Sequence, residues 1–198
     1  MISLYVRNAG NVWFGVACEE DLIYATTFAS KEKEVLRGLL GSIPFDGAFQ
    51  RPEKSSAFAD QVFALLRDIY DGKEASHKFR FATDHLSSYT RKVLEVTSLI
   101  PTGYVSSYGA VAKAAGGSPR AVGRIMALNP FPPIVPCHRV VSSDFTLGGY
   151  GGGLYAKLDF LKRENRGYVS KREIAADGGK LQLFPVEFVL RRLEKGKR

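Results

Sequence analysis

Cysteine is scarce in this chain of 198 residues, which contains only Cys18 and Cys137, beside three histidines and one tryptophan. Two cysteines so far apart in the sequence do not make the disulfide framework of a small secreted domain. We therefore expect the protein to work in a reducing, intracellular compartment, with both thiols free.

Long apolar runs are also missing. The sequence has no stretch of about 18 or more apolar residues, which a membrane-spanning helix needs, and its first residues lack the basic and apolar segments of a signal peptide. We expect no membrane partner and a cytoplasmic location. Hydrophobic residues still make up 45% of the chain, enough to build the core of one or two small domains.

Acidic residues are few in the second part of the chain. Residues 1–85 hold 10 basic and 12 acidic residues, whereas residues 86–198 hold 18 basic and 8 acidic residues. An excess of positive charge confined to one part is typical of a surface that binds a polyanion such as nucleic acid. The alternative is a protein that is basic without a specific partner.

The first part predicts a small α+β domain. β-Branched and aromatic runs at 12–18 and 22–28 flank the acidic turn 19–21, which indicates a β-hairpin. Helical spacing of apolar residues predicts helices over 31–40 and 56–71, and an extended connector is expected over 77–84.

The second part predicts mainly helices. A helix is expected from Ser87 or Ser88 to Ile100, and a short alanine-rich helix over 108–115. After the turn 116–118, Ser118 is a good N-cap and Pro119 suits the first position of a helix that ends near Leu128. Helix, three-residue glycine turn and helix form the helix-turn-helix pattern. A glycine-rich loop over 148–153, a helix over 154–165, a tail from Tyr168 and a final helix opened by Pro185 complete the prediction.

The helix after Ser118 has two distinct faces. Val122, Ile125 and Met126 recur at core spacing, whereas the opposite face carries Arg120, Gly123, Arg124 and Ala127. Small residues let a backbone approach a nucleic-acid groove closely, and arginines contact phosphates or insert into the duplex. Ordinary packing of two short helices explains the same pattern equally well.

Cys137 lies in the segment Pro136-Cys137-His138-Arg139-Val140-Val141. A buried, inert cysteine is the commoner explanation of such a thiol. A nucleophilic cysteine would need a base, and His138 could serve through a bridging water, since adjacent side chains of an extended segment point apart. The carboxylate that orients the imidazole would then be Asp144, Asp159 or Glu164.

Several separated motifs in one order resemble the O6-alkylguanine-DNA alkyltransferase family. The resemblance runs from about Tyr89 to Gly167 and is carried by these segments: Tyr104 to Gly109, Arg120 to Gly123, Asn129-Pro130, Pro136 to Val141, Tyr150, and Gly152 to Leu154. The first part of the chain is similar to the family only in its general pattern of strands and helices.

The resemblance implies an α+β fold. Residues 1–85 would form a ribonuclease H-like α/β domain with a short antiparallel sheet. Residues 86–167 would form a mostly helical domain that binds DNA and accepts the alkyl group, and residues 168–198 a C-terminal extension. It also implies DNA repair in duplex DNA by transfer of an alkyl group from O6 of guanine, less readily from O4 of thymine. The transfer would be irreversible, once per molecule, by a monomer associated with the nucleoid of a cell without a nucleus, and without a cofactor.

The resemblance also assigns roles to residues. Cys137 would be the acceptor thiolate, His138 its base through a water, Glu164 the group that orients His138, Asn129 a brace for the turns around the cysteine, and Tyr108 a hydrogen-bond donor to the leaving guanine. Arg120 would replace the base swung out of the duplex, with Ser118, Ala121, Gly123 and Arg124 also at the DNA. The pocket would be formed by Tyr150, Val140, Gly151, Gly152, Lys157 and Met126.

The chain departs from the family at three points. Arg124 stands where relatives often have a small residue, and Gly151 where serine is common. Some relatives hold a zinc ion in the first domain, but here Cys18, His77 and His85 are too scattered, so no metal is predicted. The alternatives left open are a lesion-binding protein that does not repair, a transcriptional regulator switched by alkylation, a cysteine hydrolase, and a plain DNA-binding module.

Overall fold

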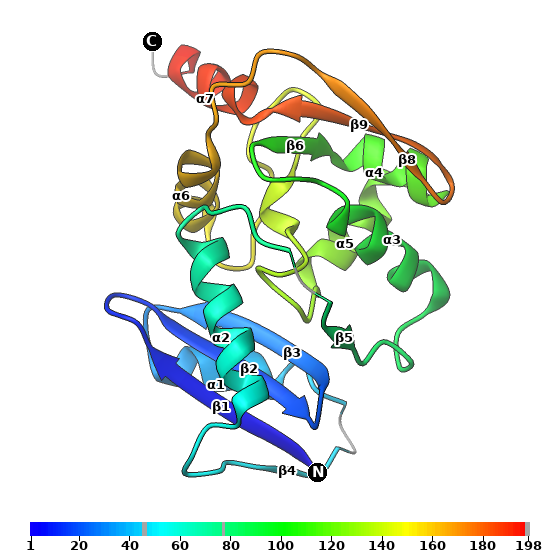
Figure 1. Ribbon diagram of the computed structural model, residues 1–198. Coiled ribbons are helices and arrows are strands. Elements are labelled where there is room, and N and C mark those ends of the chain that lie inside the picture. Colours follow the sequence, from blue (N-terminus) through cyan, green and yellow to red (C-terminus); the bar gives the residue numbers. More distant parts are fainter. Residues whose placement is uncertain (45–46, 77, 197–198) are drawn as a thin grey trace. The chain divides into compact units, whose positions relative to one another are not determined.

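The computed structural model describes residues 1–44, 47–76 and 78–196 and divides the chain into two compact units (Figure 1). The first unit comprises residues 1–70, 75–87 and 130–134, and the second comprises residues 71–74, 88–129 and 135–198. The part of the predicted connector at His77 lies outside the described residues. In the part of the chain that the structure describes, no helix is both long and apolar enough to span a bilayer.

The first unit is built on a five-stranded sheet with the order β4-β1-β2-β3-β5. Strands β1 (Ile2–Asn8), β2 (Trp13–Glu19) and β3 (Leu22–Ala29) pair antiparallel, which confirms the predicted hairpin, and the two-residue strands β4 (Phe49–Gln50) and β5 (Arg80–Phe81) pair parallel at the edges. Helices α1 (Glu32–Leu40) and α2 (Ala57–Tyr70) lie where the apolar spacing predicts them. A core cluster formed by β1, β2, β3 and α1 contains Leu4, Ala17, Ala25, Val35 and Leu39.

The second unit combines helices with a four-stranded sheet of order β7-β6-β9-β8. Its helices are α3 (Ser88–Ser98), α4 (Tyr108–Ala115), α5 (Pro119–Ala127), α6 (Leu154–Glu164) and α7 (Val186–Lys195). Its strands are β6 (Tyr104–Ser107), β7 (Val140–Val141), β8 (Arg172–Ala176) and β9 (Gly179–Pro185). The mostly helical domain expected from the sequence therefore also contains a sheet.

Helices α4 and α5 are defined by local caps. The Ser107 hydroxyl accepts a hydrogen bond from the Ala110 N–H, and the Ser118 hydroxyl accepts one from the Ala121 N–H, so each helix begins at a serine N-cap. Gly116 ends α4 in the left-handed region at φ 79°, a conformation that glycine adopts without strain. The predicted pair of helices with its tight turn is thus present.

The predicted C-terminal extension is not separate from the second unit. Strand β9 pairs antiparallel with β6 through Tyr104 and Val105, and Val186 and Val189 of α7 are buried in a cluster with Val105 and Leu161. In β9, the buried residues Leu181, Leu183 and Pro185 alternate with more exposed neighbours, which is the period-two pattern of a strand with one buried face. The pattern is short, and the sequence alone predicts a tail there rather than the hairpin β8–β9.

The division of the chain into two units is also less simple than the predicted single boundary at residue 85, because each unit contains a segment from the other side of it. Residues 130–134 belong to the first unit, where the Thr26 N–H donates to the carbonyl of Pro130 and the Thr26 hydroxyl donates to that of Pro132. Residues 71–74 belong to the second unit, where the carbonyl of Gly72 accepts a hydrogen bond from Arg166. Each segment is held by long-range hydrogen bonds that the sequence does not reveal.

Candidate active site

Cys137 opens a single turn of 3-10 helix, Cys137–Arg139, directly before β7. The residue is buried, with 5% of its surface exposed. The turn is fixed by backbone hydrogen bonds from Cys137 N–H to Val135 O (2.8 Å) and from Arg139 N–H to Pro136 O (2.9 Å). The Asn129 amide donates to the same Val135 carbonyl at 3.0 Å, so the end of α5 is tied to the segment that carries the cysteine.

A buried charged cluster lies beside this turn. His138 Nε2 and Glu164 Oε1 are 2.9 Å apart, and both side chains are fully buried. Arg139 donates to Glu164 through Nε (2.9 Å) and Nη2 (2.8 Å), and through Nη1 to the carbonyl of Ile100 (2.6 Å). Although burial raises the pKa of Glu164, His138 and Arg139 outweigh it and lower that pKa to about 2. Glu164 is therefore a carboxylate at neutral pH.

The ionised Glu164 determines the tautomer of His138. A carboxylate accepts hydrogen bonds only, so the imidazole proton lies on Nε2 and Nδ1 keeps its lone pair. Burial lowers the pKa of His138 despite the opposing effect of Glu164, which keeps the ring neutral. Nδ1 is buried and has no hydrogen-bond partner among the described residues, and the ring stacks on Phe160 at 4.5 Å between centroids. His138 is therefore held as a neutral base with one free acceptor atom.

Lys157 supplies a buried positive charge near the thiol. Its Nζ donates to the carbonyls of Val140 (2.6 Å) and Gly149 (3.2 Å) and lies 5.7 Å and 5.9 Å from the ring centres of Tyr108 and Tyr150. Burial lowers the pKa of Lys157 to about 8, and Cys137, when it is ionised, acts in the opposite direction. Burial likewise raises the pKa of Cys137, while a hydrogen bond from Asn129 and the charge of Lys157 act in the opposite direction.

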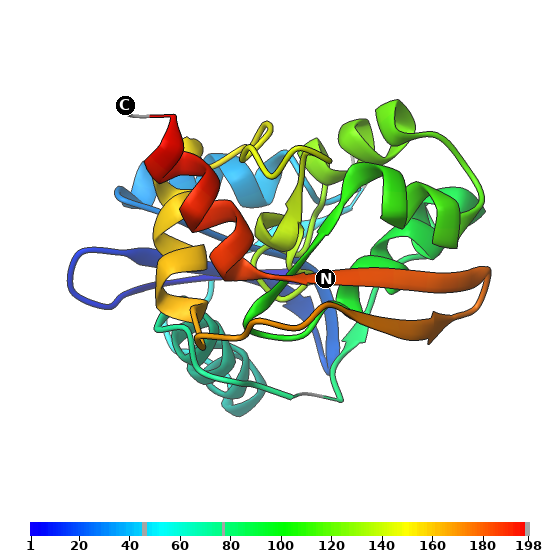
Figure 2. The same ribbon diagram turned by 90° about the horizontal axis from the view of Figure 1, so that it is seen from above.

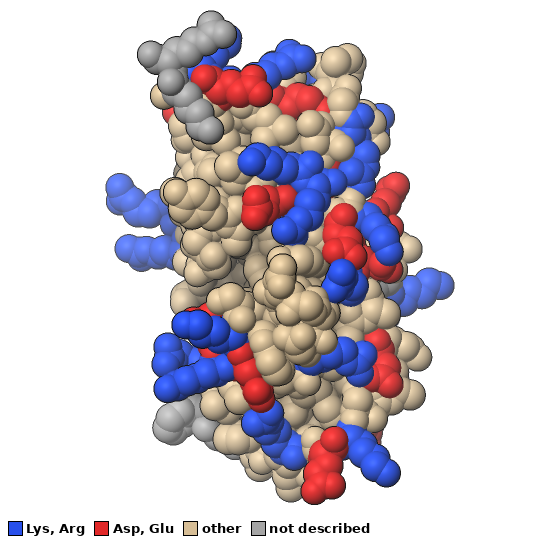
Figure 3. Space-filling model, turned by 90° about the vertical axis from the view of Figure 1, so that its left-hand side faces the viewer, with Lys and Arg blue, Asp and Glu red and all other residues tan. Residues whose placement is uncertain are grey.

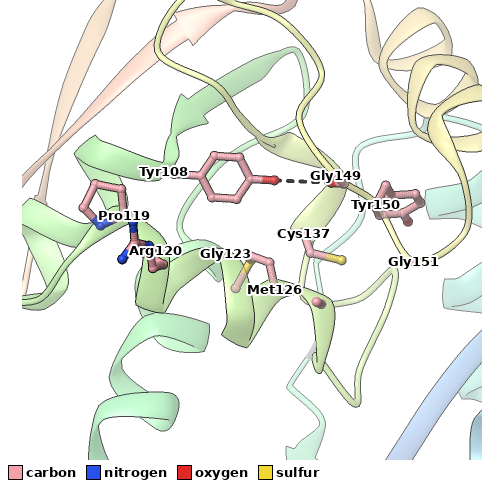
Figure 4. A pocket seen from close by; sticks show the side chains of 10 residues that line it. Tyr108, Pro119, Arg120, Gly123, Met126, Cys137, Gly149, Tyr150 and Gly151 are labelled. Carbon is pink, nitrogen blue, oxygen red and sulfur yellow. Dashed lines mark hydrogen bonds between the residues drawn. The ribbon is translucent and has the colours of Figure 1, made fainter.

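The thiol faces a pocket of about 620 Å³ (Figure 4). Helix α5, the start of α4 and the glycine-rich loop form its walls, and its lining residues are Tyr108, Pro119, Arg120, Gly123, Met126, Ala127, Cys137, Gly149, Tyr150 and Gly151. The Tyr108 hydroxyl donates to the carbonyl of Gly149 at 3.3 Å, a hydrogen bond that is dashed in Figure 4. Burial raises the pKa of Tyr108, as does Cys137 when it is ionised, and burial raises the pKa of Tyr150 more strongly, so both phenols stay protonated.

The structure groups most of the predicted site residues. Tyr108, Arg120, Gly123, Met126, Tyr150 and Gly151 line the pocket with Cys137, whereas His138, Glu164, Asn129 and Lys157 lie behind it as buried supports. Ser118, Ala121, Arg124, Gly152 and Val140 are not lining residues. The N–H of Val140 is paired with the carbonyl of Cys137, and its own carbonyl accepts a hydrogen bond from Lys157.

Sequence reasoning missed Arg139, the second partner of Glu164. An arginine within the apolar run 134–141 was the available indication, because a charged side chain in such a run needs a buried partner. Among the described residues, no group of three or more histidine, cysteine, aspartate or glutamate side chains is arranged to hold a metal ion. His77, considered above as a zinc ligand, lies outside those residues.

Comparison with known proteins relates this chain to DNA methyltransferases. Residues 88–166 match the family model described as the DNA-binding domain of 6-O-methylguanine DNA methyltransferase. A methylated-DNA–protein-cysteine methyltransferase of Methanothermobacter thermautotrophicus is 47% identical over 78 residues, which are 39% of this chain and 44% of that relative. The chain thus spans less than half of that relative's length.

Two further matches cover nearly the whole of the relative. A methylated-DNA–protein-cysteine methyltransferase of Methanocaldococcus jannaschii is 46% identical over 158 residues, which are 80% of this chain and 91% of the relative. The crystal structure of the O6-methylguanine-DNA methyltransferase of Pyrococcus kodakaraensis has a TM-score of 0.63 at 30% identity and covers 83% of this chain and 99% of that one. The chain therefore belongs to the methylated-DNA–protein-cysteine methyltransferase family of enzymes.

Proposed function

We propose that this protein repairs duplex DNA by moving a methyl or larger alkyl group from O6 of guanine, less readily from O4 of thymine, to its own Cys137. The observation that carries the proposal is the position of Cys137. The thiol faces a pocket between α5 and the glycine-rich loop, while His138, Glu164 and Lys157 lie buried behind it.

The chemical step is a displacement at carbon. A base removes the proton from the Cys137 thiol, and the resulting thiolate attacks the alkyl carbon. The new S–C bond forms as the C–O6 bond breaks. The electron pair of the C–O6 bond leaves with the purine, which takes up a proton to become guanine. A thioether has no easy route back to a thiol, so each molecule reacts once and needs no cofactor.

His138 is the base in this proposal, acting from Nδ1 through a bridging water. Its Nε2 is held by Glu164, whose carboxylate stabilises the imidazolium that forms. Burial raises the pKa of the Cys137 thiol, so proton removal is coupled to the reaction rather than completed beforehand. The nearby charge of Lys157 favours the thiolate as it develops.

The pocket would hold a guanine turned out of the duplex. Extrusion costs a few kcal/mol, and Arg120, exposed at the start of α5, would offset part of this cost by filling the gap in the stack. Tyr108 would donate a hydrogen bond to the leaving purine, Tyr150 and Met126 would wall the pocket, and Gly151 and Gly152 would offer backbone N–H groups.

The helix pair α4–α5 would act as a helix-turn-helix that binds the minor groove. Gly123 and Ala127 add little bulk to the outer face of α5, and Arg124 and Ser118 are exposed beside them. Small residues allow the close approach that a minor-groove contact needs. Binding without a row of base-reading side chains suits a protein that scans any sequence for damage.

Transfer of label tests the proposal directly. A duplex containing O6-methylguanine with a radiolabelled methyl group is incubated with the protein and with the Cys137→Ala variant. We expect label on Cys137 at no more than one equivalent and none on the variant. Repeated turnover would instead support a cysteine hydrolase, and binding without transfer would support a lesion-binding protein. Size-exclusion chromatography tests the prediction that the protein is a monomer.

A further inference from the structure

A second pocket lies on the C-terminal helix, outside the site described above. It has a volume of about 310 Å³ and is lined by Phe145, Phe188, Arg191, Arg192 and Lys195. The three basic side chains are exposed on α7. Figure 3 shows basic side chains over the whole of one face, including its upper part at the height of α7 in Figure 1, with acidic side chains among them. The proposed repair reaction does not use any of these residues.

Three aromatic rings form the floor of this surface. Phe145 packs edge-on against Phe184 (5.2 Å between centroids) and Phe188 (5.4 Å). Lys171 adds a fourth cation, since its Nζ lies 5.4 Å from the ring centre of Phe184 and 6.0 Å from that of Phe188. We call Lys171, Arg191, Arg192 and Lys195 the α7 cation group. The Lys171 ammonium thus lies over two of the rings, and the three basic side chains of α7 line the pocket beside them.

The turn that carries Phe145 is tightly built. Ser142 and Thr146 pair through the backbone at 3.0 Å, and Phe145 has a φ of 63°, a conformation that bulky residues rarely adopt. The Asp144 carboxylate accepts hydrogen bonds from the N–H (3.1 Å) and hydroxyl (2.7 Å) of Thr146, which lower its pKa. Asp144 is thus bound within its own turn, and the neighbouring Arg192 lowers its pKa only to a lesser degree.

The same loop borders both pockets. Phe145 lines the α7 pocket and Gly149 lines the pocket of Cys137, so the two Cα atoms are at most about 14 Å apart along the chain. Figures 1 and 2 show this yellow loop beside α7. Along the axis of a DNA duplex, each strand advances by about 3.4 Å per phosphate. Four nucleotides of one strand therefore advance about as far along the duplex as the upper limit on this Cα separation.

We propose that the α7 cation group is a second DNA-binding site, which contacts the phosphate backbone on one side of the extruded nucleotide. The inference rests on the proposed function, because it requires DNA at the pocket of Cys137. The position of the group favours DNA as its partner over an acidic protein segment. The loop that carries Phe145 continues directly into the wall of the pocket that is proposed to hold guanine. The site would lengthen the footprint on DNA without reading its sequence.

A charge-matched pair of variants tests the proposal. The first, Arg191→Gln/Arg192→Gln/Lys195→Gln, removes three cations from α7. The control, Lys31→Gln/Lys33→Gln/Lys54→Gln, removes three exposed cations from the first unit. Affinity for an undamaged duplex is measured at several salt concentrations, and transfer from free O6-benzylguanine is measured in parallel.

We expect the α7 variant alone to bind duplex about tenfold or more weakly, with the slope of log K against log salt reduced by about 0.9 for each phosphate that α7 no longer neutralises. Its transfer from free O6-benzylguanine should match that of the unmodified protein. Equal slopes for the α7 variant and the control would overturn the second site. Absence of label transfer from an O6-methylguanine duplex to Cys137 in the unmodified protein would instead refute the proposed function.

A second readout locates the contact. Two duplexes carry O6-methylguanine about one base pair from one end or from the other, so that the short side ends before it reaches α7. The α7 variant should slow repair of only the duplex that extends over α7, because the other provides no phosphates there. An equal effect on both duplexes would contradict a contact on one side of the lesion.

Discussion

Arg139 positions the Glu164 carboxylate, which in turn orients the proposed base His138, and a substitution of Arg139 can therefore be tested through the pH dependence of the reaction. Its guanidinium contacts both oxygens of Glu164, and its charge lowers the pKa of His138 and of Glu164. In Arg139→Gln both pKa values should rise, so that the acid limb of the pH–rate profile for alkyl transfer moves to higher pH. Arg139→Lys keeps the charge and should leave that limb near its original position.

The same variants separate positioning from folding. Breaking a buried ion pair costs about 3–5 kcal/mol, because the remaining charge is left unpaired. Arg139→Gln should therefore also unfold at lower urea concentration. A variant that loses stability while its acid limb stays in place would show that Arg139 has only a structural role.

Glu164 should make the free energy of unfolding depend on pH in the acidic range. Its pKa is about 2 in the folded protein and about 4.3 in an unfolded chain. Because the folded pKa is the lower one, Glu164 stabilises the fold above about pH 4.3, and this contribution disappears as the pH falls toward about 2. The contribution amounts to about 3 kcal/mol. Urea unfolding at a series of pH values from neutral to strongly acidic measures it.

The control for this prediction is a surface carboxylate. Glu164→Gln should lose stability at neutral pH and show a flatter dependence on pH than the unmodified protein. Glu95→Gln, at an exposed position of α3, should follow the unmodified curve. Parallel curves for all three proteins would rule out Glu164 as a source of acid sensitivity.

The sequence predicts those site residues that lie in a recognisable local segment, and it does not predict those whose partners are distant in the sequence. Cys137 and His138 lie in one recognisable segment, and Glu164 is one of three downstream carboxylates among which only the family resemblance selects. Arg139 could not be placed, because its contacts to Ile100 and Thr102 span 39 and 37 residues of sequence. A charged side chain is expected at the surface unless its partners are known.

At the scale of elements, α5 provides a test that separates stability from DNA binding. Gly123 is inside the helix, and a Cβ built there meets no atom within 4 Å. Gly123→Ala should therefore stabilise the protein by about 0.5–1 kcal/mol through helix propensity. The same methyl group would stand between α5 and the minor groove, so duplex affinity should fall.

Gly109→Ala in α4 is the matched control, since a Cβ there meets only Ser107 Oγ at 3.8 Å, an ordinary contact. It should leave duplex affinity unchanged. Thermal unfolding and duplex titration measure the two effects. Stronger or unchanged DNA binding in Gly123→Ala would argue against a close approach of α5 to DNA.

The elements that the sequence predicts well are those with local determinants. Helices α4 and α5 have serine caps, a C-terminal glycine after α4 and clear apolar faces, and their bounds match the prediction within one residue. Strands β6 and β7 are only four and two residues long and pair with each other through Ser106 and Val140. Such short strands exist because of long-range pairing, which leaves no period in the local sequence.

At the scale of the whole molecule, the chain from Arg172 to Lys195 is expected to be required for folding of the second unit. Strand β9 covers the edge of β6, and the Ser106 hydroxyl donates to the carbonyl of Gln182 at 2.7 Å. Leu181, Leu183, Val186 and Val189 are at most 1% exposed. Burying a side chain of this size contributes about 1.5–3 kcal/mol, and the sum is comparable to the whole net stability of an ordinary domain.

A chain that ends at Gly167 should therefore lose the native second unit, although it retains every residue assigned to alkyl transfer. The expected results are loss of near-ultraviolet circular dichroism, binding of a hydrophobic dye and no transfer from free O6-benzylguanine. A chain that ends at Gly196 keeps α7 complete and should behave like the full-length protein. If the shorter chain kept a cooperative thermal transition and full transfer, then β8, β9 and α7 would be an appendage, and the sheet with β6 would contribute nothing to the site.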